Sequence, residues 1–275
     1  YSVSINAAGD RIIVGAKYAD SPSRTSEGYA HVYDFDGNNW IYQSDIPYYG
    51  ADFDYFGHST AINSIGNRVV VGAPQSQTNN YSGGKVSIYD FDGNNWINVG
   101  TIASYSSDDE NGSSVAINAL GNRVATGAPR NNGNGNEAGQ VRIFEQDSTS
   151  WVVLGAEFLG EEIEDLSGTS IALNSLGDRV AIGAPGNNYW YGHVRVYEYR
   201  YVSYAEFLNT NSNDFTQNPG TPPILVGAQS GWNSDPNHMY WIQMGEDIDG
   251  LAQFDRYGGS VSMNDLGDKI AVGVP

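Results

Sequence analysis

SVAINALGNRVATGAP, residues Ser114–Pro129, is one of five copies of a single pattern in this chain of 275 residues. The pattern reads approximately S-x-x-(I/L/M)-N-x-x-G-(D/N)-(R/K)-(I/V)-x-x-G-A-P. The other copies are Ser2–Ala16, Ser59–Pro74, Ser170–Pro185 and Ser260–Pro275. A recurring unit of this length is one supersecondary module that cannot bury its apolar face alone. We therefore expect the units to stack on one another.

The repeated Asn of each copy sets the register of the units. It stands at positions 6, 63, 118, 174 and 264, so three steps are nearly equal and the fourth is longer. This spacing predicts one domain over 1–275, built from a regular array with a single insertion. The units are expected at about 1–56, 57–111, 112–167 and 168–257, the last with an insertion over 200–240, followed by a partial unit at 258–275.

Each unit contains four short segments with strand character, separated by Gly, Asn, Asp and Pro. In the third unit these segments are Ser114–Asn118, Arg123–Gly127, Gly139–Gln146 and Trp151–Gly155. The second segments are almost continuously apolar and suit strands buried on both faces, whereas the third segments alternate and suit strands nearer the rim. Four strands per repeat predict an all-β propeller blade. We expect a recurrent Trp to pack between blades, at Trp40, Trp96, Trp151 and Trp241.

The repeated units of the chain resemble the FG-GAP repeats of the integrin alpha-subunit β-propeller. The resemblance lies in Phe56-Gly57 before a first strand and in the Gly-Ala-Pro that ends the second strands at Pro74, Pro129 and Pro185. It implies a β-propeller of four-stranded blades, about 4.5 of them present, as part of a seven-bladed ring. A five-bladed ring, or a ring completed by another chain, remains an alternative.

Composition narrows the classes of partner. The chain has 32 Asp and Glu against 13 Lys and Arg, a formal net charge of −19, which repels nucleic acid. No run of apolar residues is long enough for a membrane span. The chain has no Cys, so disulfides give no information on compartment. Two Asn-x-Ser acceptors for N-glycosylation, Asn80 and Asn111, agree with an extracellular or cell-surface location.

The family resemblance also implies a calcium loop between the first and second strands. Here those loops are several residues shorter and keep at most one carboxylate, which is too few for the six or more oxygen ligands of Ca²⁺. We therefore expect no cofactor and no metal. Aligned on the Gly-Ala-Pro, the last calcium ligand of the family is replaced by a cation at Arg11, Arg68, Arg123, Arg179 and Lys269. These cations either bridge carboxylates or carbonyls in place of the ion, or are solvated charges at strand starts.

A second recurrent feature is an Asp three residues before the Gly that precedes each first strand, at Asp54, Asp109, Asp165 and Asp255. These Asp residues either accept hydrogen bonds from nearby backbone amides or form a weak cation or sugar site. The acidic loops should emerge on the same face as the links between second and third strands. Candidate ligand contacts in those links are Tyr81, Tyr189, Trp190 and Tyr191. The three consecutive aromatics either contact a sugar or a protein, or pack inward.

No catalytic constellation stands out in the sequence. The four His residues are not clustered, and no Ser-His-Asp set, metal-ligand spacing or phosphate loop is present. We expect a non-enzymatic binding, adhesion or structural module that meets a protein or a glycan at the cell surface, as a single copy, a homo-oligomer or a filament. The alternative is a carbohydrate-active propeller, either a lectin or a glycoside-processing enzyme. The insertion should project from the face opposite the acidic loops.

Overall fold

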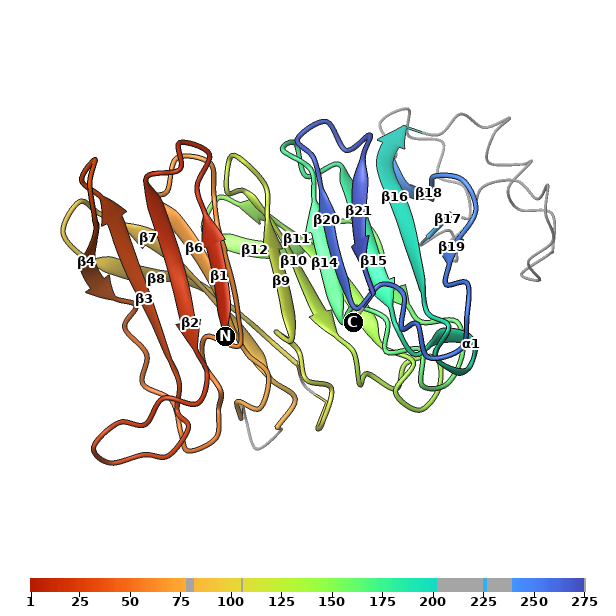
Figure 1. Cartoon of the computed structure of the whole chain (residues 1–275), viewed down its shortest axis with the longest axis horizontal. Helices are drawn as coiled ribbons and strands as arrows, with labels where there is room; N and C mark the ends of the chain where they lie inside the picture. The colour runs from red at the N-terminus through yellow and green to blue at the C-terminus, as the bar shows by residue number, and fades with distance from the viewer. Residues whose placement is uncertain (78–81, 105, 202–224, 227–238, 275) are drawn as a thin grey trace.

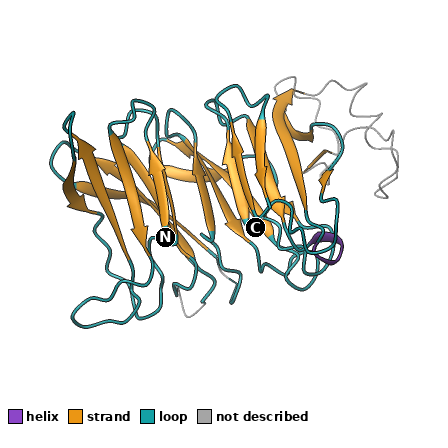
Figure 2. Cartoon of the chain, viewed as in Figure 1, coloured by secondary structure: helices purple, strands orange, loops and turns teal. Residues whose placement is uncertain are grey.

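The structure is a computed structural model that describes residues 1–77, 82–104, 106–201, 225–226 and 239–274. These residues form an all-β protein, shown in Figure 2, in which the one described helix is the short turn α1 (Asn187–Trp190). Within the described part of the chain, no helix has both the length and the hydropathy needed to cross a bilayer.

The first two units each form a four-stranded antiparallel sheet in which consecutive strands are neighbours (Figure 1). The first sheet contains β1 (Ser2–Ile5), β2 (Arg11–Ala16), β3 (Tyr29–Phe35) and β4 (Trp40–Asp45). The second contains β5 (Ser59–Ile62), β6 (Arg68–Ala73), β7 (Lys85–Phe91) and β8 (Trp96–Ala103).

The third and fourth units follow the same strand order with additions. The third contains β9 (Ser114–Ile117), β10 (Arg123–Ala128), β11 (Gln140–Asp147) and β12 (Ser150–Val153), with β13 (Phe158–Leu159) paired to β11. The fourth contains β14 (Ser170–Leu173), β15 (Arg179–Ala184), β16 (His193–Tyr201) and β18 (Met239–Gln243), with β17 (Leu225–Val226) paired to β18 and β19 (Ile248–Asp249) to β16. The fifth sheet is β20 (Ser260–Met263) and β21 (Ile270–Gly273).

The five first strands lie around one common space. Residues of β1, β5, β9, β14 and β20 together line a cavity of about 380 Å³, and no residue of another described strand lines it. The first strands of all five units therefore lie next to one another along this groove, as the stacking of the units predicts. The described chain thus holds four complete sheets and a two-stranded fifth, while a closed seven-bladed ring stays a prediction.

The repeated Ser and Gly residues explain why neighbouring units stack so closely. The Ser114 hydroxyl donates to the Gly168 carbonyl of the next unit at 2.7 Å, while the Gly127 carbonyl accepts from the Gly112 N–H of its own unit at 2.9 Å. A Cβ on Gly127 would lie 2.1 Å from the Gly168 oxygen, so only glycine fits there. The same hydroxyl-to-carbonyl bond joins Ser2 to Gly57, Ser59 to Gly112 and Ser170 to Gly258.

The repeated Asn closes the turn between the first and second strands. In the third unit, the Asn118 side-chain oxygen accepts from the Arg123 N–H at 2.9 Å, and its amide donates to Asn122 at 2.8 Å. The side chain therefore satisfies backbone donors that the tight turn leaves unpaired.

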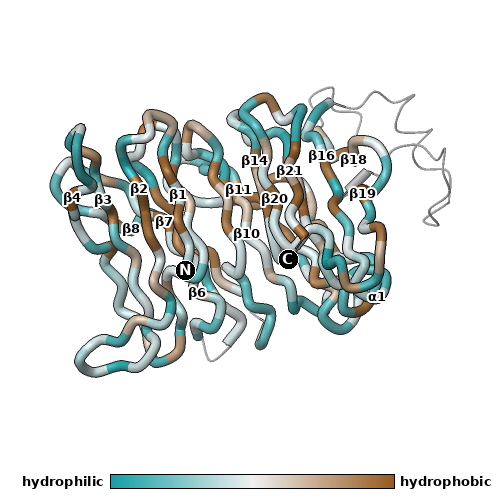
Figure 3. Tube along the Cα trace, viewed as in Figure 1, coloured by the Kyte–Doolittle hydropathy of each residue, from teal (hydrophilic) through white to brown (hydrophobic). Residues whose placement is uncertain are grey.

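The hydrophobic core lies between successive sheets, and the hydrophobic colour of Figure 3 follows the strands that face the groove. Trp96 and Trp241 are buried between units as expected, whereas Trp40 is 41% exposed. The third strands are more buried than the sequence predicts. Ser87, His193 and Arg195 stand at alternate polar positions of third strands, yet all three are buried. Arg195, for example, contacts Leu159 and Glu161 of the third unit.

Candidate functional sites

The repeated Arg of each complete unit joins two neighbouring units. In the second unit, Arg68 donates from Nε and Nη2 to the Asp90 carboxylate at 2.5 and 2.6 Å. Its Nη1 donates to the Gly121 carbonyl of the next unit at 2.9 Å and to Gln146 Oε1 at 2.6 Å. One guanidinium group therefore holds the third strand of its own unit and the first turn of the next.

The other complete units repeat this bridge with their own carboxylate and carbonyl: Arg11 with Asp34 and Gly66, Arg123 with Glu145 and Gly177, and Arg179 with Glu198 and Gly267. The hydrogen bond to Asp34 raises the pKa of Arg11. Lys269 lies in the fifth sheet, where no third strand is described. For the four Arg residues, the bridging interpretation therefore fits the contacts, and the solvated-charge interpretation does not.

The four recurrent Asp residues close their own loops. Asp165 Oδ2 accepts from the Glu161 and Glu162 N–H groups, both at 2.8 Å, and its Oδ1 accepts from Asn187 at 3.1 Å. Backbone amides also donate to the carboxylates of Asp54 and Asp255. Such bonds to backbone amides are the structural role that Asp commonly has in turns.

Burial then argues against these Asp residues as ligand contacts. Asp54, Asp109 and Asp165 are buried, and only Asp255 reaches the surface in part. In the second unit, Asp109 accepts from Ser104 at 2.5 Å and from Asn131 at 3.0 Å instead of from backbone amides. Of the two interpretations, the hydrogen-bonding one fits the contacts, and we correct the ligand-binding assignment of Asp54, Asp109 and Asp165 because these three are buried inside the loops.

The acidic loops and the links between second and third strands lie together on one face, as expected. The Glu164 N–H donates to the Asn136 carbonyl at 2.8 Å, and the Ser167 N–H donates to the Ala138 carbonyl at 3.0 Å. Equivalent bonds join Phe56 to Glu27 and Tyr257 to Tyr191. This face lies at the lower ends of the sheets in Figure 1.

The first two of the three consecutive aromatics, Tyr189 and Trp190, lie in a left-handed turn rather than in an extended loop. Tyr189 and Trp190 have φ angles of +57° and +71°, a region that costs about 1–2 kcal/mol per non-glycine residue. Tyr189 is 77% exposed, whereas Trp190 and Tyr191 are half-buried. The Arg256 guanidinium lies 5.0 Å from the centre of the Trp190 ring. The structure thus presents one of the three rings to solvent and packs the other two.

The two candidate glycosylation sites have different outcomes. Asn111 is fully buried, and its side-chain amide donates to the Ile102 carbonyl at 3.1 Å. An Asn in this position cannot carry a glycan in the folded protein, so this expectation was wrong. Asn80 and Tyr81 lie outside the described residues, as does most of the insertion.

Where the insertion is described, β17 forms a short strand, and β16 ends at the face opposite the acidic loops (Figure 1).

A row of exposed aliphatic side chains was missed by the sequence analysis. In the second to fifth units, the turn between first and second strands carries one at the same place, and we call these four residues the apolar turn row: Ile65, Leu120, Leu176 and Leu266. They are between 66 and 77% exposed. An aliphatic residue at a fixed place in an otherwise polar turn was the signal that could have identified them.

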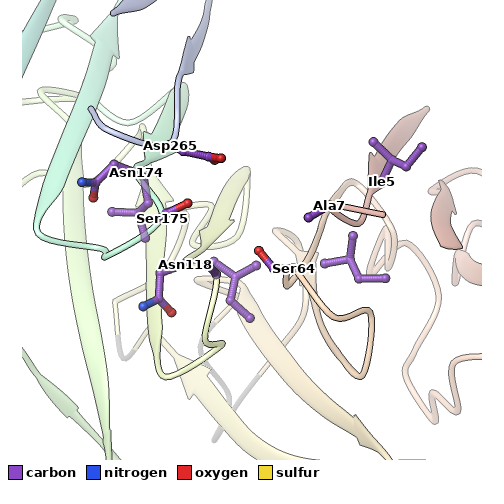
Figure 4. A pocket seen from close by; sticks show the side chains of 11 residues that line it. Ile5, Ala7, Ser64, Asn118, Asn174, Ser175 and Asp265 are labelled. Atoms are coloured by element: carbon purple, nitrogen blue, oxygen red, sulfur yellow. The ribbon is translucent and has the colours of Figure 1, made fainter. Parts of the chain in front are cut away.

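The turns that carry this row are hydrogen-bonded in series. The Ser64 N–H donates to the Ala119 carbonyl at 3.2 Å, the Ala119 N–H to Ser175 at 3.0 Å, and the Ser175 N–H to Asp265 at 3.1 Å. Beside them lies a cavity of about 170 Å³ at the mouth of the groove, shown in Figure 4. The turns that carry the apolar turn row are therefore joined in one series on this face.

A second feature, which we call the fourth-unit polar cluster, contains Glu161, His193, Arg195, Gln243 and Asp247. His193 Nδ1 lies 3.4 Å from Asp247 Oδ2, and Arg195 Nη1 lies 3.1 Å from Glu161 Oε1. Burial, and then the charge of Arg195, lower the pKa of His193 to about 4. The cluster is therefore a buried charged network between the third and fourth units.

No protein-family model matches this chain, and no curated protein matches its sequence. In structure, the chain is similar to a functionally unknown protein from Desulfotomaculum acetoxidans, with a TM-score of 0.54 and 14% sequence identity. The likeness is one of fold. The alignment covers 98% of this chain and spans 61% of the length of that protein. The resemblance to FG-GAP repeats remains a prediction.

Proposed function

We propose that this protein is a non-enzymatic binding or adhesion module, located outside the cell or on its surface, that holds a protein partner on the apolar turn row. The observation that carries the proposal is the exposure of an aliphatic side chain at the same turn position in four successive units. Contiguous exposed apolar surface on a soluble protein often marks an interaction site.

The scaffold beneath the row is suited to binding. The turns are fixed by the repeated Asn, by the turn-to-turn hydrogen bonds and by the Arg bridges. Loops on a rigid frame present side chains without a large cost in conformational entropy on binding. The net charge of −19 would draw a basic partner toward this surface at long range.

The propeller ring and the surface location belong to the same proposal. The cavity lined by all five first strands supports a radial arrangement of blades, with further blades or another chain completing the ring. The acidic composition agrees with a surface protein. In this arrangement the Arg bridges take the place of the calcium ions of the FG-GAP repeats. Homo-oligomers or filaments form through the face of the acidic loops or the face of the apolar turn row.

A carbohydrate-active propeller is the second candidate, and the exposed ring of Tyr189 favours it. An exposed aromatic face beside polar groups can stack on a sugar ring. A glycan array and turnover assays on the same glycans test this alternative. Binding that is lost in Tyr189→Ala and retained in Leu120→Ser would favour a lectin, and turnover would favour an enzyme.

The protein-binding proposal is tested by selecting random peptides displayed on phage against the immobilised protein. We expect apolar peptides to be enriched and to lose binding to the double variant Leu120→Ser/Leu176→Ser. The matched control is Phe53→Ser/Tyr189→Ser, which removes two exposed apolar side chains from the opposite face. Peptides that bind both variants equally, or no enrichment at all, would contradict the proposal.

A further inference from the structure

The fourth-unit polar cluster brings together three side chains that are typical metal ligands. Glu161, His193 and Asp247 each offer one ligand atom, and these three atoms lie within 4.8 Å of one another. They come from separate segments: the acidic loop before β14, the first residue of β16, and the loop between β18 and β19. The packing of the third unit against the fourth therefore assembles the group.

The His193 side chain approaches the cluster with Nδ1, which lies 3.4 Å from Asp247 Oδ2. It is 1% exposed, and among the described residues its Nε2 has no hydrogen-bond partner. Leaving such a buried polar atom unpaired costs about 1–3 kcal/mol. An unpaired buried group in a native structure calls for a reason, such as an ion or an ordered water.

The carboxylates of the cluster are held in place by neighbours that would not themselves bind a metal. Gln243 donates to Asp247 Oδ1 at 2.6 Å, and Arg195 Nη1 lies 3.1 Å from Glu161 Oε1. Metal ligands in proteins are commonly oriented by such outer hydrogen bonds. The positive charge of Arg195 opposes a cation, but Asp165 and Asp249 also act electrostatically on Arg195 and Asp247, so the surroundings are net acidic.

We propose that Glu161, His193 and Asp247 bind one divalent transition-metal ion of the Zn²⁺ class. A set of one imidazole nitrogen and two carboxylates suits Zn²⁺, Co²⁺ or Mn²⁺, whereas Ca²⁺ and Mg²⁺ prefer oxygen ligands alone. This site differs from the shortened calcium loops, and the sequence analysis expected no metal. The ion would fasten the third unit to the fourth.

The third unit supplies a matched comparison. Gln140 occupies the position of His193, since each is the first residue of its third strand and pairs with the Ala that ends the second. The Gln140 amide donates to Glu157 Oε2 at 2.9 Å. Glutamine is thus tolerated at this place in the repeat, and His193→Gln should fold while removing the nitrogen ligand.

The test is a titration of the untagged full chain, stripped with EDTA, with Co²⁺ followed by visible absorption and with Zn²⁺ followed by calorimetry. We expect one equivalent to bind, with affinity reduced more than about 100-fold in His193→Gln. That exceeds the 10–100-fold typical of residues that only orient a ligand. Glu161→Gln should weaken binding, whereas Glu162→Gln, with the same change in charge on the exposed part of the same loop, should not.

Far-ultraviolet circular dichroism checks that each variant is folded before the titration. The proposal is overturned if the wild-type chain binds neither ion saturably at one equivalent. It is also overturned if folded His193→Gln binds as tightly as wild type, or if Glu162→Gln loses as much affinity as Glu161→Gln.

Discussion

Replacing Gly127 by Ala should separate the third and fourth units. The added Cβ would lie 2.1 Å from the Gly168 oxygen, whereas ordinary contacts begin near 3.4 Å. The next unit would have to move by more than 1 Å, which stretches the 2.7 Å bond from the Ser114 hydroxyl to the Gly168 carbonyl. Overpacking costs about 1–3 kcal/mol and a lost hydrogen bond about 0.5–1.5 kcal/mol, so we expect a loss of about 1.5–4.5 kcal/mol.

Gly273→Ala is the matched control, because Gly273 has the same place in the fifth unit. Its added Cβ would meet the Ser260 hydroxyl, which can rotate away, and then nothing closer than 3.5 Å. We expect this variant to lose less than about 1 kcal/mol, in the range of most substitutions away from a packed contact. Urea unfolding followed by circular dichroism measures both. Equal losses in the two variants would refute the reasoning that the Gly-to-carbonyl approach joins the units.

Three further outcomes follow from single residues. Arg68→Lys keeps the charge but loses the paired bonds to Asp90 and the bond to the next unit. Urea unfolding should therefore show a free energy of unfolding lower by about 1–2 kcal/mol. An unchanged unfolding midpoint would contradict the bridging role of Arg68. Burial, and then Lys17, lower the pKa of His58 to about 4. The unfolded chain therefore binds a proton here at higher pH than the folded chain, and stability should fall as pH drops from about 6.5 to 4. His58→Ser should flatten that part of the curve of Tm against pH, and an unaltered curve would contradict the lowered pKa of His58. After expression in a secretory host, peptide mapping should find Asn111 unmodified because it is buried, whereas a glycan there would contradict the fold around it.

The sequence predicted the strands well, because one pattern constrained five copies at once. In the third unit the observed strands begin and end within two residues of the expected segments, and the apolar second strands are buried as expected. The bridging interpretation of the Arg residues also came from alignment alone. Both depend on local residue types at fixed spacing, which a single sequence displays directly.

Features that depend on neighbouring units could not be predicted in the same way. The alternation around His193 and Arg195 is typical of a strand near the rim, but residues of the third unit cover Arg195, which contacts Leu159 and Glu161. The left-handed turn at Tyr189 has no signature in residue type, since large aromatics rarely adopt positive φ. The sequence shows the repeated aliphatic residue of the apolar turn row, but only the structure shows that the turns carrying it are joined in series.

The central claim is that successive units pack through their first strands, and a disulfide between two of those strands tests it most directly. The Ser2 and Thr60 hydroxyl oxygens, on β1 and β5, lie 3.1 Å apart, and the chain has no Cys to interfere. Mild oxidation of Ser2→Cys/Thr60→Cys should form one intramolecular disulfide, seen by mass as the loss of both thiols, while Ser2→Cys/Ser114→Cys, which skips one unit, should keep its thiols free. Free thiols in the first variant, or an intramolecular link in the second, would contradict the arrangement.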